Sequence, residues 1–169
     1  MSRSLMGAAH IASSQGGFEP QRQNNWAIEI EITNREILEL SLSKGFLPRE
    51  MNEPIAIHYL NEVVYVAGKT TYEEGTVEVI DYVDQNTAKV LSDWRRLVYQ
   101  AETGIIGPAV SYKKRGTIVM FSPDGKTERK WDLIGMWPHT VDFGTLDMAA
   151  SEVLRATLTI RFDKAIPAL

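Results

Sequence analysis

Residues 57–87 constrain the fold of this 169-residue chain more than any other stretch. They read IHYLNEVVYVAGKTTYEEGTVEVIDYVDQNT, which is two β-patterned segments, a polar loop, a third strand and the start of a helix. Strands are expected at 55–59 and 63–66, and at 76–80 after the polar loop 68–75. The stretch is rich in residues that build sheets and interfaces, and it holds no recognisable catalytic constellation. The pattern favours a protein whose function lies in its shape and its assembly.

A second β-patterned region, residues 26–43, predicts a hairpin with one apolar face and one acidic, hydroxyl-rich face. Apolar and polar side chains alternate through 26–33 and again through 36–43, and Asn34-Arg35 between them has the character of a turn. The expected apolar face holds Ile28, Ile30, Ile32, Leu38, Leu40 and Leu42. The expected polar face holds Ala27, Glu29, Glu31, Glu39, Ser41 and Ser43.

One amphipathic helix is expected next, because the apolar positions of 90–101 fall on a single stripe. Asp84 or Asn86 can cap its start, and Gly104 is placed to end it. Further strands at 117–121, 130–134 and 153–162 bring the total to about eight strands. The expected fold is mainly β, an antiparallel sandwich or barrel with one flanking helix.

Composition places the chain among single-domain proteins. A flexible polar arm is expected at 1–24, followed by one β domain at 25–169. No apolar run approaches the ~20 residues that span a bilayer, and the N-terminal residues lack an apolar segment of signal-peptide length. Folding in a cytoplasm is therefore expected.

Enzymatic and metal chemistry find little support in the residues. Cysteine is absent, which excludes disulfides and thiolate chemistry, and His10, His58 and His139 are scattered without metal-ligand spacing. Glu29 and Glu31 would lie roughly 7 Å apart on an open strand face, which offers neither a pocket nor an environment that raises a pKa. We expect no catalytic residue, no metal and no cofactor.

The polar face of the predicted hairpin has a use if several subunits join edge to edge into a cylinder. The apolar faces would then pack against the cores while the polar faces line a channel. The net charge of −4 disfavours gripping nucleic acid, and an acidic channel repels phosphates, so DNA can pass without sticking. The lumen-facing candidates are Glu29, Glu31, Glu39, Ser41 and Ser43. Ordinary solvent exposure of the same side chains is the alternative.

Several short motifs, in order and spacing, resemble the tail tube proteins of contractile-tailed bacteriophages, the T4-type tube family. They are PQRQNNW at 20–26, Leu47-Pro48, IHYLN at 57–61, VAGK at 66–69, DYVD at 81–84, Trp94, YKK at 112–114, SPDG at 122–125 and KWDLIGMWP at 130–138. The resemblance extends from about residue 18 to the end of the chain. Each motif alone is weak, and their combination carries the resemblance.

The resemblance implies a structural protomer of a virion tail, whose hairpins contribute to an inter-subunit barrel and whose hexameric rings stack into a conduit for genome ejection. Implied partners are further copies of the chain, the tail sheath protein, baseplate or initiator proteins, tail terminator proteins, the tape measure protein and double-stranded DNA. Loops 44–54 and 68–75 are the expected ring-stacking elements, with Lys44, Arg49, Glu50, Lys69, Glu73 and Glu74 as interface candidates. The same fold serves tubes of tailocins and type VI-like injection systems, and a monomeric small-ligand-binding β-barrel is the second alternative.

Overall fold

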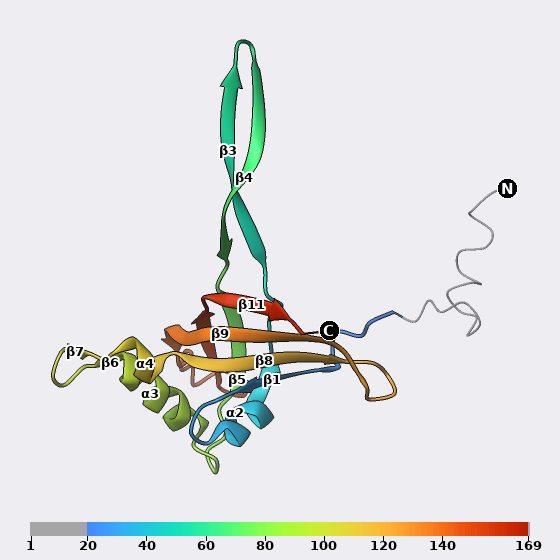
Figure 1. Cartoon of the computed structure of the whole chain (residues 1–169). Coiled ribbons are helices and arrows are strands. Elements are labelled where there is room, and N and C mark those ends of the chain that lie inside the picture. The colour runs from blue at the N-terminus through green and yellow to red at the C-terminus, as the bar shows by residue number, and fades with distance from the viewer. Residues whose placement is uncertain (1–19, 169) are drawn as a thin grey trace.

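The computed structural model describes residues 20–168. The first nineteen residues of the predicted N-terminal arm lie outside them. Three helices and eleven strands are assigned in the described part: β1 (Trp26–Ile30), α2 (Arg35–Ser41), β2 (Leu42–Lys44), β3 (Glu50–Tyr59), β4 (Glu62–Tyr72), β5 (Gly75–Ile80), α3 (Thr87–Val98), β6 (Tyr99–Gln100), β7 (Ile105–Ile106), α4 (Ala109–Tyr112), β8 (Lys114–Phe121), β9 (Thr127–Asp142), β10 (Arg155–Arg161) and β11 (Lys164–Pro167). The chain is mainly β, as the patterning predicts (Figure 1).

Seven strands form one antiparallel sheet in the order β1-β8-β9-β10-β5-β2, with β11 paired to β9 beside this path. The 16-residue strand β9 serves both halves, since its first part pairs with β8 and β11 and its last part with β10. Gly135 sits between the two parts with φ of +71°, a conformation that glycine adopts without strain. The sheet therefore turns at β9 and curls into a half-barrel.

The core lies inside the curl. One half of the sheet contributes Ile28, Ile30, Ile118 and Leu133, and the other contributes Val77, Val79, Leu158 and Ile160. Helices α2 and α3 lie beneath the sheet in Figure 1 and add Leu38, Leu91 and Trp94 to the same core. Val90, Leu91, Trp94 and Val98 of the predicted apolar stripe form the buried face of α3, whereas Leu97 is 42% exposed and Ala101 lies beyond the end of the helix at Val98. Trp94 Nε1 donates a hydrogen bond to the carbonyl of Tyr112.

The predicted second strand of the N-terminal hairpin is wrong. Residues 35–41 form helix α2, and only 42–44 form a strand, β2, which pairs with β5 rather than with β1. Leu38 is buried whereas Leu40 is 84% exposed, so the alternating leucines do not share one face. Because β1 and β2 lie at opposite ends of the strand path, the chain between them must cross the open side of the half-barrel, and a helix makes that crossing.

Other boundaries also differ from expectation. The predicted loop 68–75 is mostly strand β4, and only Glu73 and Glu74 connect β4 to β5; the predicted loop 44–54 narrows to residues 45–49, since β3 begins at Glu50. The short elements β6, β7, α4 and β11 have too little periodicity to be predicted from sequence. Strand β11 is defined by its pairing with the distant strand β9, whereas β6 and β7 pair with each other a few residues apart and α4 is a single helical turn.

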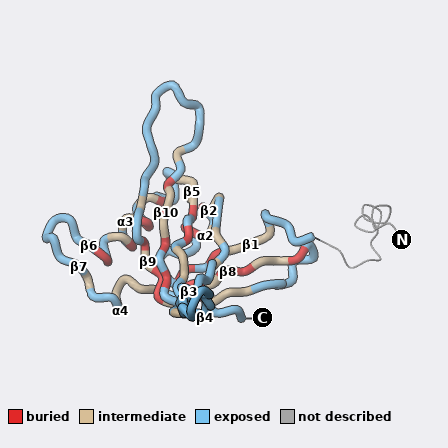
Figure 2. The backbone as a smooth tube through the Cα atoms, turned by 90° about the horizontal axis from the view of Figure 1, so that it is seen from above, coloured by how far each residue is buried: buried red, intermediate tan, exposed pale blue. Residues whose placement is uncertain are grey.

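Strands β3 and β4 form a long antiparallel hairpin that projects from the body (Figure 1). Pairing runs from Glu50 opposite Tyr72 to Tyr59 opposite Glu62, with an irregularity between Asn52 and Pro54. Both strands are exposed along nearly all of their length. Figure 2 views the hairpin from its tip, in the colour of exposed residues. The hairpin continues the paired strands β2 and β5, because β2 leads into β3 and β4 leads into β5.

Candidate assembly surfaces

The hairpin presents apolar side chains on both of its faces. Cross-strand register places Ile55 opposite Val66 and Ile57 opposite Val64. Because side chains alternate along a strand, these four residues share one face. The other face carries Ala56, His58, Val63 and Tyr65. Ile57 is 50% exposed and Val64 is 55% exposed, so much of this apolar surface is in water. Contiguous exposed apolar surface of this kind marks an interaction site.

Polar contacts hold the base of the hairpin. Arg49 and Glu73 form an ion pair of 3.2 Å, and the hydroxyl of Tyr72 donates a 2.8 Å hydrogen bond to Oε1 of Glu50. That hydrogen bond to the Glu50 carboxylate raises the pKa of the Tyr72 phenol. The predicted stacking residues Arg49, Glu50 and Glu73 are thus brought together at the root of the ribbon. Lys69 lies further along β4 and is exposed.

The remaining two stacking candidates lie elsewhere. Lys44 is on β2 and pairs with Glu78, and Glu74 follows β4 and pairs with Arg161. Both lie against strands of the curled sheet rather than on the ribbon. The structure therefore divides the predicted stacking set between the hairpin and the sheet.

The predicted lumen set does not share one surface. Glu29 and Glu31 are exposed on the outer side of β1 and just beyond its end, opposite the buried Ile28 and Ile30. Ser41 is only 2% exposed, and its hydroxyl donates to the carbonyl of Ile37, one turn back in α2, so it faces no channel in this chain. The prediction failed for Ser41 because the alternation there belongs to a helix and not to a strand.

Glu39 and Ser43 lie apart from the β1 face. Glu39 is on α2, where burial raises the pKa of its carboxyl, the charge of Arg35 opposes the shift, and Glu29 and Glu36 reinforce it. Its Oε1 atom is buried and has no hydrogen-bond partner in the part of the chain that the structure describes. Ser43 is on β2, and its hydroxyl donates to both the carbonyl and the carboxylate of Glu78.

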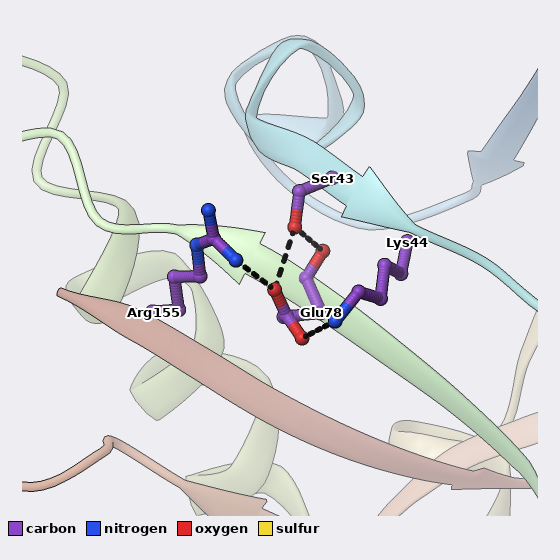
Figure 3. Close-up of polar contacts among 4 residues, drawn as sticks. All are labelled: Ser43, Lys44, Glu78 and Arg155. Atoms are coloured by element: carbon purple, nitrogen blue, oxygen red, sulfur yellow. Dashed lines mark hydrogen bonds and ion pairs between the residues drawn. The ribbon is translucent and has the colours of Figure 1, made fainter. Parts of the chain in front are cut away.

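Glu78 is the centre of a polar cluster that joins three strands (Figure 3). Its Oε2 lies 2.8 Å from Nζ of Lys44 on β2, and its Oε1 lies 3.1 Å from Nη1 of Arg155 on β10. The hydrogen bond from Lys44 is the largest influence on Glu78, and Ser43 and Arg155 add to it, so the pKa of this carboxyl lies below its ordinary value. Sequence reasoning missed this cluster, although the alternation of residues 153–162 already puts Arg155 and Arg161 on the polar face of one strand.

The edges of the curled sheet are open. Strands β1 and β2 end the path of paired strands, and cavities of about 360 and 470 Å³ are each lined by residues of both. An edge strand carries backbone N–H and C=O groups that a further strand can pair with. No cluster of three or more histidine, aspartate or glutamate side chains suited to a metal ion occurs within residues 20–168, and no helix in this range is long and apolar enough to cross a membrane.

The chain has the fold of tube components from contractile injection machines. It matches a subunit in the sheath–tube complex of an extracellular contractile injection system (PVC) with a TM-score of 0.64 at 15% identity, over 99% of this chain and 97% of that one. A subunit of the sheath/tube terminator of the same kind of system gives a TM-score of 0.70 at 12% identity, over 89% and 98%. A subunit of the anti-feeding prophage baseplate gives 0.67 at 14% identity, over 88% and 95%. At these identities the likeness shows the fold.

In sequence, the chain is similar to the tail tube protein gp19 of Enterobacteria phage T4, with 28% identity over 146 residues, 84% of this chain and 88% of the relative. The tail tube protein gp19 of Enterobacteria phage T6 is 27% identical over the same shares. No family model matches. The predicted resemblance to T4-type tail tube proteins is confirmed.

Proposed function

We propose that the chain is the structural protomer of a contractile bacteriophage tail tube, and that it assembles into stacked hexameric rings that conduct DNA into the host. The similarity to two phage tail tube proteins across most of both chains carries this proposal. The curled sheet with open edges and the exposed hairpin supply a physical means of assembly. In this role the protein is a structural component of the tube and carries out no catalysis and needs no cofactor.

The hairpin supports self-assembly because it is poorly suited to stand alone in water. A two-stranded ribbon is marginally stable by itself and needs a third strand or a packing surface. Its distal half is apolar on both faces, and residues 54–67 include a single carboxylate, Glu62, and no Lys or Arg. Contact with further copies of the chain would cover this surface, and the hairpin's direction away from the body suits contact between successive rings.

The proposed stacking residues are those of the hairpin and its root: Arg49, Glu50, Lys69 and Glu73. Lys44 and Glu74, the other two candidates, are held on the sheet by Glu78 and Arg161 and are not assigned to the ring contact. Two surfaces are candidates for the channel wall: the β1 face with Glu29 and Glu31, and the surface of β2 with Ser43. Glu39 on α2 lines the cavity between these two strands. We also propose that residues 1–24 form an arm that contacts a neighbouring subunit, and that residues 25–169 form the tube domain. The position of each residue relative to the hairpin and the sheet edges supports the stacking and channel assignments, and the polar composition of residues 1–24 supports the assignment of the arm.

The proposed partners are those of a contractile tail: the sheath protein outside the tube, the baseplate or initiator at one end and the terminator at the other. The matched structures come from a sheath–tube complex, a baseplate and a tube-terminating cap, which supports this set. The tape measure protein and double-stranded DNA would occupy the lumen without sequence-specific contacts. Assembly would take place in the host cytoplasm and the product would reside in the virion tail.

Tubes of extracellular injection systems are the second candidate, favoured by the fold matches to such machines. Neighbouring genes separate the two, since capsid and terminase genes indicate a phage and effector genes indicate an injection device. A monomeric ligand-binding barrel is a third candidate, and it requires a closed apolar pocket with convergent polar groups.

Negative-stain electron microscopy of the purified protein tests the proposal. We expect rings or tubes, either spontaneously at high concentration or after addition of the baseplate or initiator complex. A soluble monomer before nucleation is compatible with the proposal. A protein that stays monomeric at high concentration and in the presence of the initiator would refute it.

A further inference from the structure

The outer surface of β2, β5, β10 and the end of β9 carries an equal number of positive and negative side chains. We call it the Glu78 face, after the residue at its centre. Its charged residues are Lys44, Arg155, Arg161, Glu78 and Asp142 on the strands, together with Glu74 in the connection that leads into β5. The strand register places Glu78 on β5 and Asp142 on β9 directly opposite Thr157 on β10, so these three side chains lie on the same face of the sheet. Three cations and three carboxylates give this face a net charge of zero.

Each cation of the Glu78 face is held by a carboxylate of the same chain. Lys44 and Arg155 lie 2.8 and 3.1 Å from the two oxygens of Glu78 (Figure 3). Nη1 of Arg161 lies 3.3 Å from Oε2 of Glu74, which also lies 3.5 Å from Nδ1 of His139. These pairs link neighbouring strands and place each cation beside a carboxylate of the same chain, while the side chains of Lys44, Arg155 and Arg161 remain 68%, 50% and 53% exposed.

Threonines fill the space between the two ion-paired groups. Thr76 on β5 lies opposite Thr159 on β10, and Thr157 lies opposite Glu78. The alternate residues of the same strands, such as Val77 and Leu158, point to the core and are at most 1% exposed. The Glu78 face is therefore a polar, neutral sheet surface whose strands turn apolar side chains to the core.

We propose that the Glu78 face lines the channel, and that its internal ion pairs let a polyanion such as double-stranded DNA pass without being bound. This inference rests on the proposed function as a tube. Free Lys and Arg side chains bind DNA by displacing counterions from phosphates, whereas a cation already paired with a carboxylate gains less from the exchange. A face with zero net charge also sets up neither a strong attraction nor a strong barrier for a moving phosphate backbone.

The course of the strands supports the choice of this face over the β1 face with Glu29 and Glu31. Strands β2 and β5 of the Glu78 face continue directly into β3 and β4, the hairpin assigned to contact between rings. A surface built on these strands would run on from one ring toward the next. The β1 face has no such continuation, since β1 leads through residues 31–34 into helix α2.

A single thiol locates the face in assembled tubes. The chain contains no cysteine, so Thr159→Cys introduces the only thiol, and Glu29→Cys does the same on the β1 face as a matched control. In tubes we expect Cys at 159 to react with a small maleimide and to be protected from a maleimide carrying a polyethylene glycol chain too bulky for the channel. The control thiol should not show this size selection. Equal reaction of the thiol at 159 with both reagents, or protection from both, would overturn the inference.

Removing one carboxylate tests the role of the ion pairs. Glu78→Gln leaves Lys44 and Arg155 without their shared partner, and tubes of this variant should retain short duplex DNA in a pelleting assay at least about tenfold more than wild-type tubes at low salt, with the difference lost at high salt. Glu29→Gln makes the same charge change on the β1 face and should leave retention unchanged. Glu74→Gln, which frees Arg161, serves as a second variant if Glu78→Gln does not assemble.

The outcomes separate the two proposals. Absence of tubes from the wild-type protein and initiator refutes the proposed function. If tubes form normally and Glu29→Gln increases DNA retention, the Glu78 face is refuted as the channel wall. The same holds if neither Glu78→Gln nor Glu74→Gln increases DNA retention. In both cases the proposed tube function stands.

Discussion

Weakening one face of the β3–β4 hairpin should raise the concentration at which the protein assembles. The double variant Ile57→Thr and Val64→Thr removes apolar groups from a cross-strand pair and keeps β-branched side chains, so the strands themselves are preserved. Both residues stand clear of the core cluster. The variant therefore tests contacts between copies rather than the folding of one copy.

The size of the effect follows from exposure. Full burial of an Ile or Val side chain contributes about 1.5–3 kcal/mol. Since Ile57 and Val64 are 50% and 55% exposed in the isolated chain, assembly can add about half of that for each, or about 1.5–3 kcal/mol for the pair. Threonine forfeits most of this gain. At about 1.4 kcal/mol for each factor of ten, the critical concentration should rise by about 10- to 150-fold.

Sedimentation of tubes over a range of protein concentrations measures the critical concentration. Thermal unfolding of the unassembled protein is the control, and its midpoint should match the wild type. An unchanged critical concentration, with normal tubes, would show that this face stays in water after assembly and would refute the reasoning. The matching change on the other face, Val63→Thr with Tyr65→Thr, shows whether both faces are covered.

Three further predictions concern the stability of the unassembled protein, measured by urea unfolding. Gly135→Ala should lower the free energy of unfolding by about 1–3 kcal/mol, because the φ of +71° strains an L-residue and the new Cβ would meet the Asp163 carboxylate. Gly125→Ala is the control: its φ is +82° but the space around it is open, so only the backbone strain should lower the free energy of unfolding. Leu133→Ala should cost about 2–5 kcal/mol, since Leu133 is 1% exposed in the core. Glu39→Gln should stabilise the protein at pH 7, because a raised carboxyl pKa makes ionisation costly in the folded state; the gain should vanish as the pH falls below the ordinary glutamate pKa, where both forms are uncharged. A gain that persists in acid would contradict this cause.

Local patterning was a reliable guide for α3 and β1, each of which turns one surface to the core. The stripe of residues 90–101 predicted α3, and the alternation in 26–30 predicted β1 with Ile28 and Ile30 inward. In these segments, the requirement to bury apolar side chains selects the same period in sequence and in structure. The mainly β fold class followed from many such segments together.

Patterning misled where the route of the chain decided the structure. Residues 36–43 alternate like a strand, yet they cross between the two ends of the sheet path, and α2 makes that crossing with Ser41 buried and bonded within the helix. The lumen set built on that alternation was split for the same reason. Strand β11 likewise exists only because β9 offers it an edge.

By itself, the sequence determined that the protein is a β-rich single chain without cysteine chemistry, and its motifs indicated a tube protein. Only the tertiary structure decided that Lys44, Glu78 and Arg155, up to 111 positions apart in sequence, meet on one neutral face, and that the hairpin leaves the body with both faces exposed. The physical reason is that burial is encoded in local periodicity, whereas the pairing of charges across strands depends on sheet order and register, which distant segments set together.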